Sequence, residues 1–408
     1  MVVLFPFYSL TRAVGSRVLI VHPQSAPTNR FWRRTNFVFS LSMQHSVVAC
    51  GYWHTAALDG EGNVWTNGNN TYGQLGYGDH RREPERIPEL INITSIACGR
   101  YYTMCLDYNG HVWGFGANGY GQLGLGHTDI RKKPEKIPNL PEIISIACGF
   151  AHTICIDSGS RAWGFGWNES SQLGIASRGD VVTPTLIPKL SQVQRASCGK
   201  NHTLFLDNEG KVFVLGDNEK GKLGVPPETS IIPVPQMHPT LTDIVSVSCG
   251  VHHSAVLDEY GEVYVMGDSK ATRTTESPHK LENLPYIRTI ACGYYHTMMI
   301  DDNGHVWGFG DNRSKQVGKE DMVEFSKATE ILFGVYPNRK SIGASFISQG
   351  GETTIVKEDG GDIYVFGNNY KGQLGLNSGN EFVSPTPLDG SLSTIIGERI
   401  HRTKSARK

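Results

Sequence analysis

One stretch decides the fold: Ala147-Cys148-Gly149-Phe150-Ala151-His152-Thr153. Further versions, which keep the Cys-Gly pair and end on a hydroxyl residue, occupy residues 49–55, 97–103, 197–203, 248–254 and 291–297. A seventh version, residues 348–354, keeps only the outline. The aligned glycines lie 48, 50, 50, 51, 43 and 57 residues apart. Repeats at a fixed period indicate one structural unit used many times, and seven of them leave no room for a separate catalytic domain.

Each repeat contains short runs typical of strands. In the second repeat, residues 93–98 and 102–106 are largely apolar, and residues 111–115 alternate large side chains after an Asn109-Gly110 turn. A fourth run follows near residues 134–137. Four strands without a helix are typical of a propeller blade. The sequence therefore predicts an all-β protein, a seven-bladed β-propeller of four-stranded blades.

Closure into a ring is favoured because it removes exposed sheet edges. A linear β-solenoid is the alternative, although roughly 50 residues is long for one coil of a repeat protein. Residues 47–51 and 393–397 both occupy the repeat position of residues 95–99. Either end of the propeller could therefore supply the closing strand.

The combined pattern Cys-Gly-x-x-His-Thr, Leu-Asp-x-x-Gly-x-Val-Trp and Gly-x-Asn-x-x-Gly-Gln-Leu-Gly resembles the repeat of the regulator of chromosome condensation family. Residues 68–76, 116–124 and 367–375 are close copies of its last part, whereas no Gly-Gln-Leu-Gly follows Asp268 and residues 316–318 are a weakened version. The resemblance covers roughly residues 44–397 and implies the seven-bladed fold. It indicates function only weakly, because one scaffold carries many sites.

The family's founding member is a guanine-nucleotide exchange factor for the nuclear GTPase Ran, and it inserts a β-wedge beside the nucleotide. The resemblance therefore makes exchange on a Ran-like small GTPase the alternative to a protein-interaction role. The longest interval between repeats contains residues 320–339, where a projecting loop would fit. No catalytic residue can be nominated, so enzymatic activity of the chain itself stays open.

Three motifs suggest cofactor or metal chemistry that the repeat explains better. Residues 114–119 match a dinucleotide fingerprint, but here a strand leads into a turn and not into a helix. Residues 216–223 approach a phosphate-binding loop, with Leu223 in place of the required hydroxyl. Cys-x-x-x-His pairs could ligate zinc, but a ring places one pair in each blade. We expect no cofactor and no metal. We also expect satisfied, partly buried His side chains that tie neighbouring loops, and buried free thiols suited to a reducing compartment.

The two variable positions between Gly and His fall in a loop, and ring closure gathers these loops around the channel. Aromatic and Arg side chains, which are common there, are enriched at interface hot spots. The sequence predicts a partner-binding face at Tyr52, Trp53, Arg100, Tyr101, Phe150, Lys200, Asn201, His252, Tyr294 and Tyr295. The alternative is packing between neighbouring loops. The recurring Trp65, Trp113, Trp163 and Trp307 are predicted to be core residues.

Charge divides the 408-residue chain into three parts. Residues 1–50 hold five Arg and no acid, and residues 398–408 hold five bases and one acid, so residues 51–397 keep 28 bases against 38 acids. We predict an N-terminal extension over 1–43 (disordered, transit-like or a gene-model artefact), a propeller over 44–397 and a basic tail over 398–408. Two alternatives stay open for residues 398–408: a solvated charged end, or a weak contact with chromatin. No apolar run is long enough for a membrane helix.

An acidic ring repels phosphate, which disfavours nucleic acid as a ligand of the propeller body. We therefore expect a protein partner, in the alternative a Ran-like small GTPase, with no membrane contact. We also expect a monomer in the cytoplasm, the nucleus or both.

Overall fold

The computed structural model describes residues 47–175, 179–226, 230–268, 275–319, 324–332, 343–359, 361–376, 382–388 and 393–395. The chain divides into residues 1–44 and 45–408, and every described residue belongs to the second unit. The predicted extension over 1–43 and the predicted tail over 398–408 lie outside the described residues. Within the described ranges, no helix is long and apolar enough to span a membrane.

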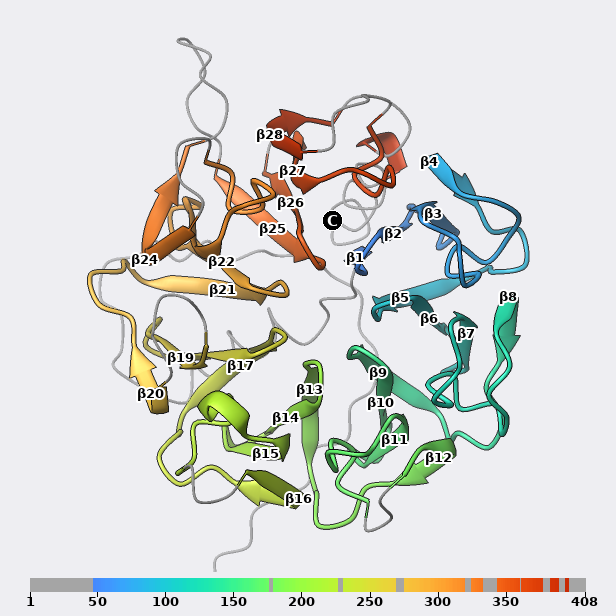
Figure 1. Ribbon diagram of the computed structural model, residues 1–408, viewed down its shortest axis with the longest axis horizontal. Helices are drawn as coiled ribbons and strands as arrows, with labels where there is room; N and C mark the ends of the chain where they lie inside the picture. Colours follow the sequence, from blue (N-terminus) through green and yellow to red (C-terminus); the bar gives the residue numbers. More distant parts are fainter. Residues whose placement is uncertain are drawn as a thin grey trace, which may run out of the picture. The chain divides into compact units, whose positions relative to one another are not determined.

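The described residues form seven four-stranded antiparallel sheets arranged around a central channel (Figure 1). The predicted seven-bladed β-propeller is confirmed. The innermost strands, which line the channel, are β1 (Val48–Cys50), β5 (Ile93–Cys98), β9 (Ile143–Cys148), β13 (Val193–Cys198), β17 (Ile244–Cys249), β21 (Ile287–Cys292) and β25 (Ala344–Gln349). The second strands are β2 (His54–Leu58), β6 (Tyr102–Asp107), β10 (His152–Asp157), β14 (His202–Asp207), β18 (His253–Asp258), β22 (His296–Asp301) and β26 (Thr353–Glu358).

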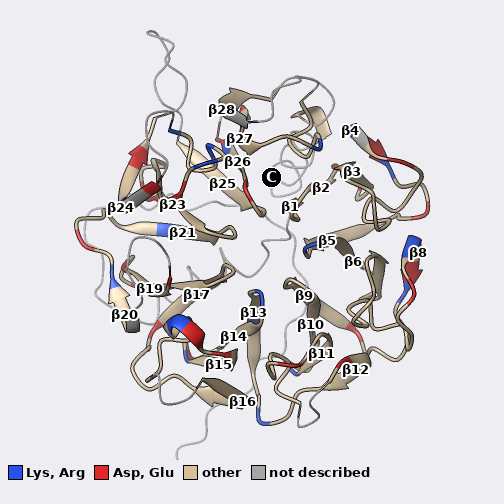
Figure 2. Cartoon of the chain, viewed as in Figure 1, with Lys and Arg blue, Asp and Glu red and all other residues tan. Residues whose placement is uncertain are grey.

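The third strands are β3 (Val64–Gly68), β7 (Val112–Gly116), β11 (Ala162–Gly166), β15 (Val212–Asp217), β19 (Val263–Gly267), β23 (Val306–Asp311) and β27 (Ile363–Asn368). The outer strands are β4 (Arg81–Arg86), β8 (Arg131–Lys136), β12 (Val181–Leu186), β16 (Ile231–Met237), β20 (Thr275–Lys280), β24 (Glu324–Ile331) and β28 (Phe382–Pro387). A short 3-10 helix, η1 (Glu219–Gly221), follows β15. Figure 2 shows that charged residues lie mainly on outer strands and loops.

The hydrophobic core lies between adjacent blades. Strands β6, β10, β14, β18 and β22 are buried along their whole length, because both of their faces pack against a neighbouring blade. Phe115 of β7, for example, packs with Ile87 and Ile96 across the junction of the first two blades. The Leu of the Gly-Gln-Leu-Gly motif, such as Leu123, is also fully buried. Side chains on both faces of a sheet therefore stabilise the ring.

Among the described residues, neither end of the propeller adds a strand to the blade at the other end. Val48–Cys50 is the innermost strand of the first blade, whereas residues 393–395 are helical. The Gly351 N–H donates to the carbonyl oxygen of Gly51 at 3.1 Å, which joins the seventh blade to the first. The Thr55 hydroxyl also donates to the carbonyl of Gln373 at 2.6 Å. Each described blade consists of four consecutive strands, so the ring closes by contact between whole blades.

The recurring Trp residues pack against the hydrophobic core, as predicted, but with only part of each side chain. Trp65, Trp113, Trp163 and Trp307 are half-buried, and each indole N–H donates to the Asp that begins the preceding turn. Asp157, for example, also accepts the backbone N–H of Gly159 and of Arg161. Burial alone would raise the pKa of Asp157, but these hydrogen bonds lower it below the ordinary value. The Leu-Asp-x-x-Gly-x-Val-Trp motif thus stabilises the turn between the second and third strands of a blade.

Candidate partner-binding face

Two sets of loops meet at one end of the channel. The first loops connect innermost to second strands, and the third loops connect third to outer strands; alternating strand direction brings both sets to the same end. We call this end the channel face. The channel behind it contains about 470 Å³ of empty space, open solvent included. It is lined by Cys and Gly of the first six blades, by Gln349 and Gly350 of the seventh, and by Arg100, Phe150, Lys200, Val251 and Tyr294.

Backbone hydrogen bonds join the first loops into a ring. The Arg100 N–H donates to the Phe150 carbonyl, and the Tyr52 N–H donates to the Arg100 carbonyl. Four of the five remaining junctions have an equivalent N–H to carbonyl bond: Phe150 to Gly199, Val251 to Tyr294, Tyr294 to Gly351 and Gly351 to Gly51. Among described residues, no such bond joins Lys200 to Val251. The loops are therefore fixed by neighbouring blades at six of the seven junctions.

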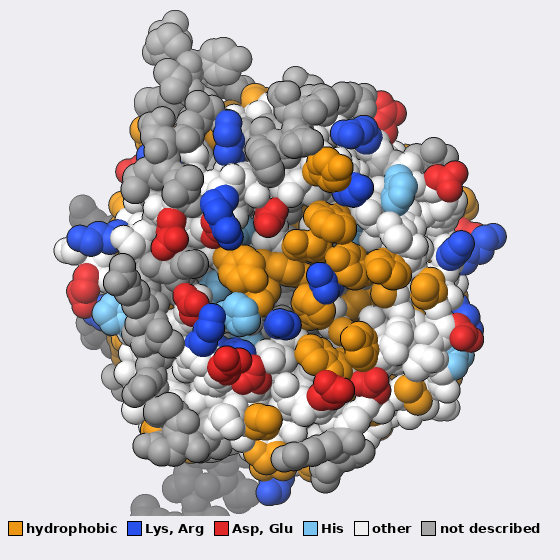
Figure 3. Space-filling model, in the orientation of Figure 1, with side chains coloured by type: hydrophobic (Ala, Val, Ile, Leu, Met, Phe, Trp, Pro, Cys, Tyr) orange, Lys and Arg blue, Asp and Glu red, His pale blue; other side chains and the backbone are white. Residues whose placement is uncertain are grey.

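Aromatic rings gather on the channel face. Tyr52 stacks on Tyr294 with ring centroids 5.0 Å apart, and it lies 4.7 Å from Trp53. Tyr101 lies 5.9 Å from Trp53 and 5.0 Å from Tyr72. The rings of this aromatic patch are Tyr52, Trp53, Tyr72, Tyr101, Tyr120, Phe150, Trp167, Tyr294 and Tyr295. Figure 3 shows hydrophobic side chains gathered around the channel and to one side of it.

A cation lies inside the aromatic patch. The Arg100 guanidinium carbon is 4.2 Å from the ring centroid of Phe150, 4.7 Å from that of Tyr101 and 5.4 Å from that of Tyr52. These distances are within the range of cation–π attraction. Burial raises the pKa of Tyr52, Tyr101 and Tyr294, so these phenols stay neutral and do not balance the charge of Arg100.

The opposite part of the channel face carries paired charges. Lys222 is buried and its ammonium lies 2.6 Å from Asp217 and 3.1 Å from the amide oxygen of Asn201. Arg313 pairs with Asp311 at 2.8 Å. Lys220 and Asp268 are 3.1 Å apart, which links neighbouring third loops. The carboxylate of Glu352 accepts hydrogen bonds from Ser314 and Asn368. The carboxylates in this part of the channel face thus already form ion pairs or hydrogen bonds with neighbouring side chains.

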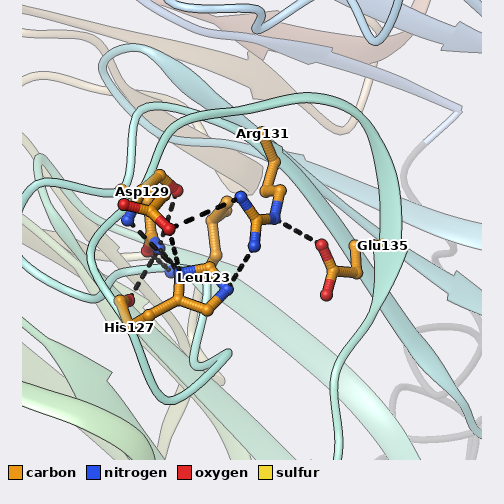
Figure 4. A network of polar contacts seen from close by, with 6 residues as sticks. Leu123, His127, Asp129, Arg131 and Glu135 are labelled. Atoms are coloured by element: carbon orange, nitrogen blue, oxygen red, sulfur yellow. Dashed lines mark hydrogen bonds and ion pairs between the residues drawn. The ribbon is translucent and has the colours of Figure 1, made fainter.

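The side chains of the residues that resemble phosphate-loop and dinucleotide motifs form hydrogen bonds and ion pairs within the third loops. Lys222, which would contact phosphate, is buried against Asp217 behind η1. In the second blade, Asn118 donates to the carbonyls of His127 and Asp129 and accepts the backbone N–H of Leu123 (Figure 4). Arg131, the first residue of β8, then bridges His127 of the loop and Glu135 of the same strand. The Asn of the repeat is therefore the centre of each third loop, not part of a ligand site.

The Cys-x-x-x-His pairs connect blades. His152 Nε2 lies 3.1 Å from the Thr203 hydroxyl of the next blade, and the His side chains are fully buried, not partly buried as expected. The thiol of Cys98 donates to the Ala49 carbonyl of the preceding blade at 3.4 Å. All eight cysteines are free. Within the described ranges, His, Cys, Asp and Glu form no cluster of three or more that could hold a metal.

All ten predicted face residues lie at the channel face, but the two variable positions differ. First positions such as Arg100, Lys200 and Tyr294 line the channel. Second positions turn toward the third loops, as Tyr101 does toward Tyr72 and Asn201 toward Asp217. The remaining members follow the same placement: Tyr52 stacks on Tyr294, Phe150 contacts Arg100, Trp53 contacts Tyr101, and His252 contacts Tyr295. Partner binding by these residues stays a prediction.

Sequence reasoning missed the aromatic residues of the third loops. Tyr72 is 38% and Tyr120 is 45% exposed, and Trp167 lies 5.7 Å from Tyr120 and 6.4 Å from Phe150. The sequence could have indicated them, because Tyr72 and Tyr120 both stand two residues after the Asn of the repeat and directly before Gly-Gln-Leu-Gly. Gln349 was also missed; it takes the place of Cys at the end of the innermost strand.

The prediction of a projecting loop over residues 320–339 is wrong for the central part of that segment. Residues 324–331 form β24, which pairs with β23 as the outer strand of the sixth blade. Residues 320–323 and 333–339 lie outside the described residues.

Comparisons with known proteins agree with this architecture. Two descriptions of the regulator of chromosome condensation (RCC1) repeat match the chain. The first matches residues 61–106, 109–156, 160–206 and 209–257; the second matches 46–74, 93–122, 143–172, 193–222 and 287–316. No curated protein matches the sequence significantly.

Solved structures share the fold. Human WBSCR16 has a TM-score of 0.69 at 19% identity, over 78% of this chain and 87% of that chain. Prp20p from Saccharomyces cerevisiae, described with its binding properties to Gsp1p and histones, has a TM-score of 0.68 at 24% identity. The match covers 76% of this chain and 81% of that chain. A chain of the structure of Kap60 bound to yeast RCC1 (Prp20) has a TM-score of 0.71 at 19% identity, and the match covers 92% of each chain. With repeat matches over most of the propeller, this chain belongs to the regulator of chromosome condensation (RCC1) repeat family.

Proposed function

We propose that this chain is a protein-interaction propeller whose partner binds the aromatic patch. The observation that carries the proposal is the set of nine rings at the channel mouth, contributed by first and third loops of several blades. Large aromatic side chains supply much contact area at low cost in conformational entropy and are enriched at hot spots. The ring of inter-blade backbone bonds presents them in a fixed arrangement, which reduces the entropy lost on binding.

The experiment is a binding comparison with matched variants. Trp53→Ala combined with Tyr72→Ala removes one half-buried and one exposed ring of the aromatic patch, and loss of partner binding is expected. Tyr108→Ala combined with Tyr260→Ala is the control, since these tyrosines are 81% and 53% exposed on turns at the opposite end of the blades. Partners captured by the wild type are purified and their dissociation constants measured for all three proteins. Equal affinity of the Trp53/Tyr72 variant and the wild type would overturn the proposal.

A second candidate is exchange of guanine nucleotide on a Ran-like small GTPase. Membership of the RCC1 repeat family supports it, as does the fold shared with Prp20p, whose described partners are Gsp1p and histones. The test is release of a fluorescent GDP analogue from a panel of purified small GTPases. Acceleration that depends on this protein supports exchange; an unchanged release rate across the panel, together with partner binding, favours the interaction role alone.

Three expectations stay predictions from the sequence: a monomer, a cytoplasmic or nuclear location, and a weak chromatin contact through residues 398–408. That tail lies outside the described residues, so its role is best tested by deleting it and comparing chromatin retention with that of the full chain.

A further inference from the structure

The channel mouth holds more positive charge than its described surroundings balance. Arg100 and Lys200 both line the channel, and no described carboxylate forms an ion pair with either. Of the acids of the channel face, Asp217 is paired with Lys222 and Asp311 with Arg313, and Glu352 accepts hydrogen bonds from Ser314 and Asn368 without forming an ion pair with Arg100 or Lys200. Although residues 51–397 carry excess acid, the centre of this face is therefore locally cationic.

Hydrogen-bond donors at the same place also lack acceptors. The Nε atom of Arg100, the hydroxyl of Tyr294 and the side-chain nitrogen of Gln349 are buried donors without a hydrogen-bond partner, and the side-chain oxygen of Gln349 is a buried acceptor without one. These three residues come from the second, sixth and seventh blades, and all of them line the channel. Leaving a buried polar group unpaired costs about 1–3 kcal/mol. A ligand that satisfies them must be rich in acceptors.

The walls of the site favour a compact oxyanion. Phe150, Tyr52 and Tyr101 surround the guanidinium and exclude water from one side of it, which strengthens its attraction for an anion. A guanidinium presents two parallel N–H donors that match the two oxygens of a carboxylate. An external cation is disfavoured, since Arg100 already occupies the aromatic cage.

We propose that the channel mouth binds a carboxylate of a protein partner, an acidic side chain inserted beside Arg100 with apolar neighbours resting on the aromatic patch. The proposal rests on the proposed interaction role, because the carboxylate comes from the partner. A nucleic-acid phosphate is the less suitable occupant, since a long polyanion would also meet the excess acid of the surrounding propeller.

The experiment uses a synthetic peptide, acetyl-Leu-Glu-Glu-Leu-amide, and the full-length protein. The side-chain N–H signals of Arg100 and Gln349 are followed by nuclear magnetic resonance during titration. Saturable shifts of both signals are expected with this peptide and not with acetyl-Leu-Gln-Gln-Leu-amide. Arg100→Met should weaken binding at least about tenfold, the scale of a lost charge-assisted hydrogen bond. Lys200→Met, which removes the second channel-lining cation, should weaken it several-fold, whereas Arg313→Met should not, because that cation is paired with Asp311.

Equal shifts with the glutamine peptide, or unchanged affinity in folded Arg100→Met and Lys200→Met variants, would overturn the carboxylate site. Inorganic phosphate that binds more tightly than the peptide would also overturn it in favour of a phosphate site. Because the peptide assay needs no partner, its result is separate from that of the Trp53/Tyr72 test. Peptide binding without loss of partner binding in that variant would refute only the role of the aromatic patch.

Discussion

The Nε2 atom of His202 lies 2.9 Å from the hydroxyl oxygen of Ser254 in the next blade. Because that hydroxyl donates its own proton to the carbonyl of Lys222, the imidazole must be the donor toward Ser254, with its proton on Nε2. The Nδ1 atom is buried without a partner. Equivalent pairs join His54 to Thr103, His152 to Thr203, His253 to Thr297 and His296 to Thr354. A protonated ring would bury an unpaired donor at each junction.

We expect the propeller to be labile to acid. Burial lowers the pKa of His54, His152 and His296 to about 3 and that of His253 to about 4, and it also lowers the pKa of His202 well below its ordinary value. In the unfolded chain these groups titrate near 6.5, so below that pH the unfolded state binds more protons and stability falls as pH falls. Each buried imidazole costs about 1.4 kcal/mol per pH unit in this window.

The measurement is the urea midpoint at several values between pH 7.5 and pH 4.5. The five imidazoles together predict unfolding well above pH 3, since typical domains have only about 5–15 kcal/mol of stability. His202→Gln should reduce the pH dependence even if it lowers stability at pH 7.5. The matched control is His111→Gln, because His111 is exposed beside Asp107. A midpoint that stays constant down to pH 5 would refute the neutral-histidine ring.

The thiols should be unreactive in the folded protein. Burial raises the pKa of Cys292 to about 11 and that of Cys249 to about 12, so almost no thiolate is present at pH 8. Ellman's reagent should therefore react slowly with native protein and promptly with all eight cysteines in guanidinium chloride. Rapid native labelling of channel-lining Cys292 or Cys249 would show that the channel admits reagent and stabilises thiolate.

Much of this architecture could be predicted because the repeat period is visible. Spacing of the glycines fixed the number of blades, and the loop after each Cys-Gly placed ten residues at one end. The sequence treated both positions of that loop alike. Successive residues point in different directions, so Arg100 and Tyr294 face the channel whereas Tyr101 and Asn201 face the third loops.

The remainder depends on distances between blades, which spacing within one repeat does not encode. Tyr294 was predicted as a surface contact, yet it is stacked on Tyr52 from a blade about 240 residues earlier in the chain, a separation typical of the long-range contacts that close a ring. Similarly, the recurring Trp residues have the apolar character of core residues. Their indole N–H groups also require an acceptor, which the buried turn Asp supplies, so each ring lies at the edge of the core.

The glycine of Cys-Gly should be indispensable for close approach of neighbouring blades. A Cβ atom on Gly199 would lie 2.1 Å from Cε1 of His202 and 2.6 Å from the carbonyl oxygen of Gly250. Gly199→Ala should therefore displace a buried imidazole and the next blade, and lower the unfolding free energy by about 3 kcal/mol or more. Gly119→Ala is the control, since nothing lies within 4 Å of its added Cβ. Equal thermal midpoints for the two variants would contradict this packing.

The buried Lys222–Asp217 pair should be replaceable only as a pair. In the first and seventh blades the same positions hold Gln74 with Asn69 and Gln373 with Asn368, and the Gln amide donates to the Asn oxygen at 3.0 and 3.2 Å. Asp217→Asn or Lys222→Gln alone leaves one buried charge unpaired and should cost about 3–5 kcal/mol. The double variant recreates the neutral pair of the other blades and should recover most of that loss. Unfolding free energies of all four proteins form a double-mutant cycle, and additive losses would show that the two side chains do not act as a unit.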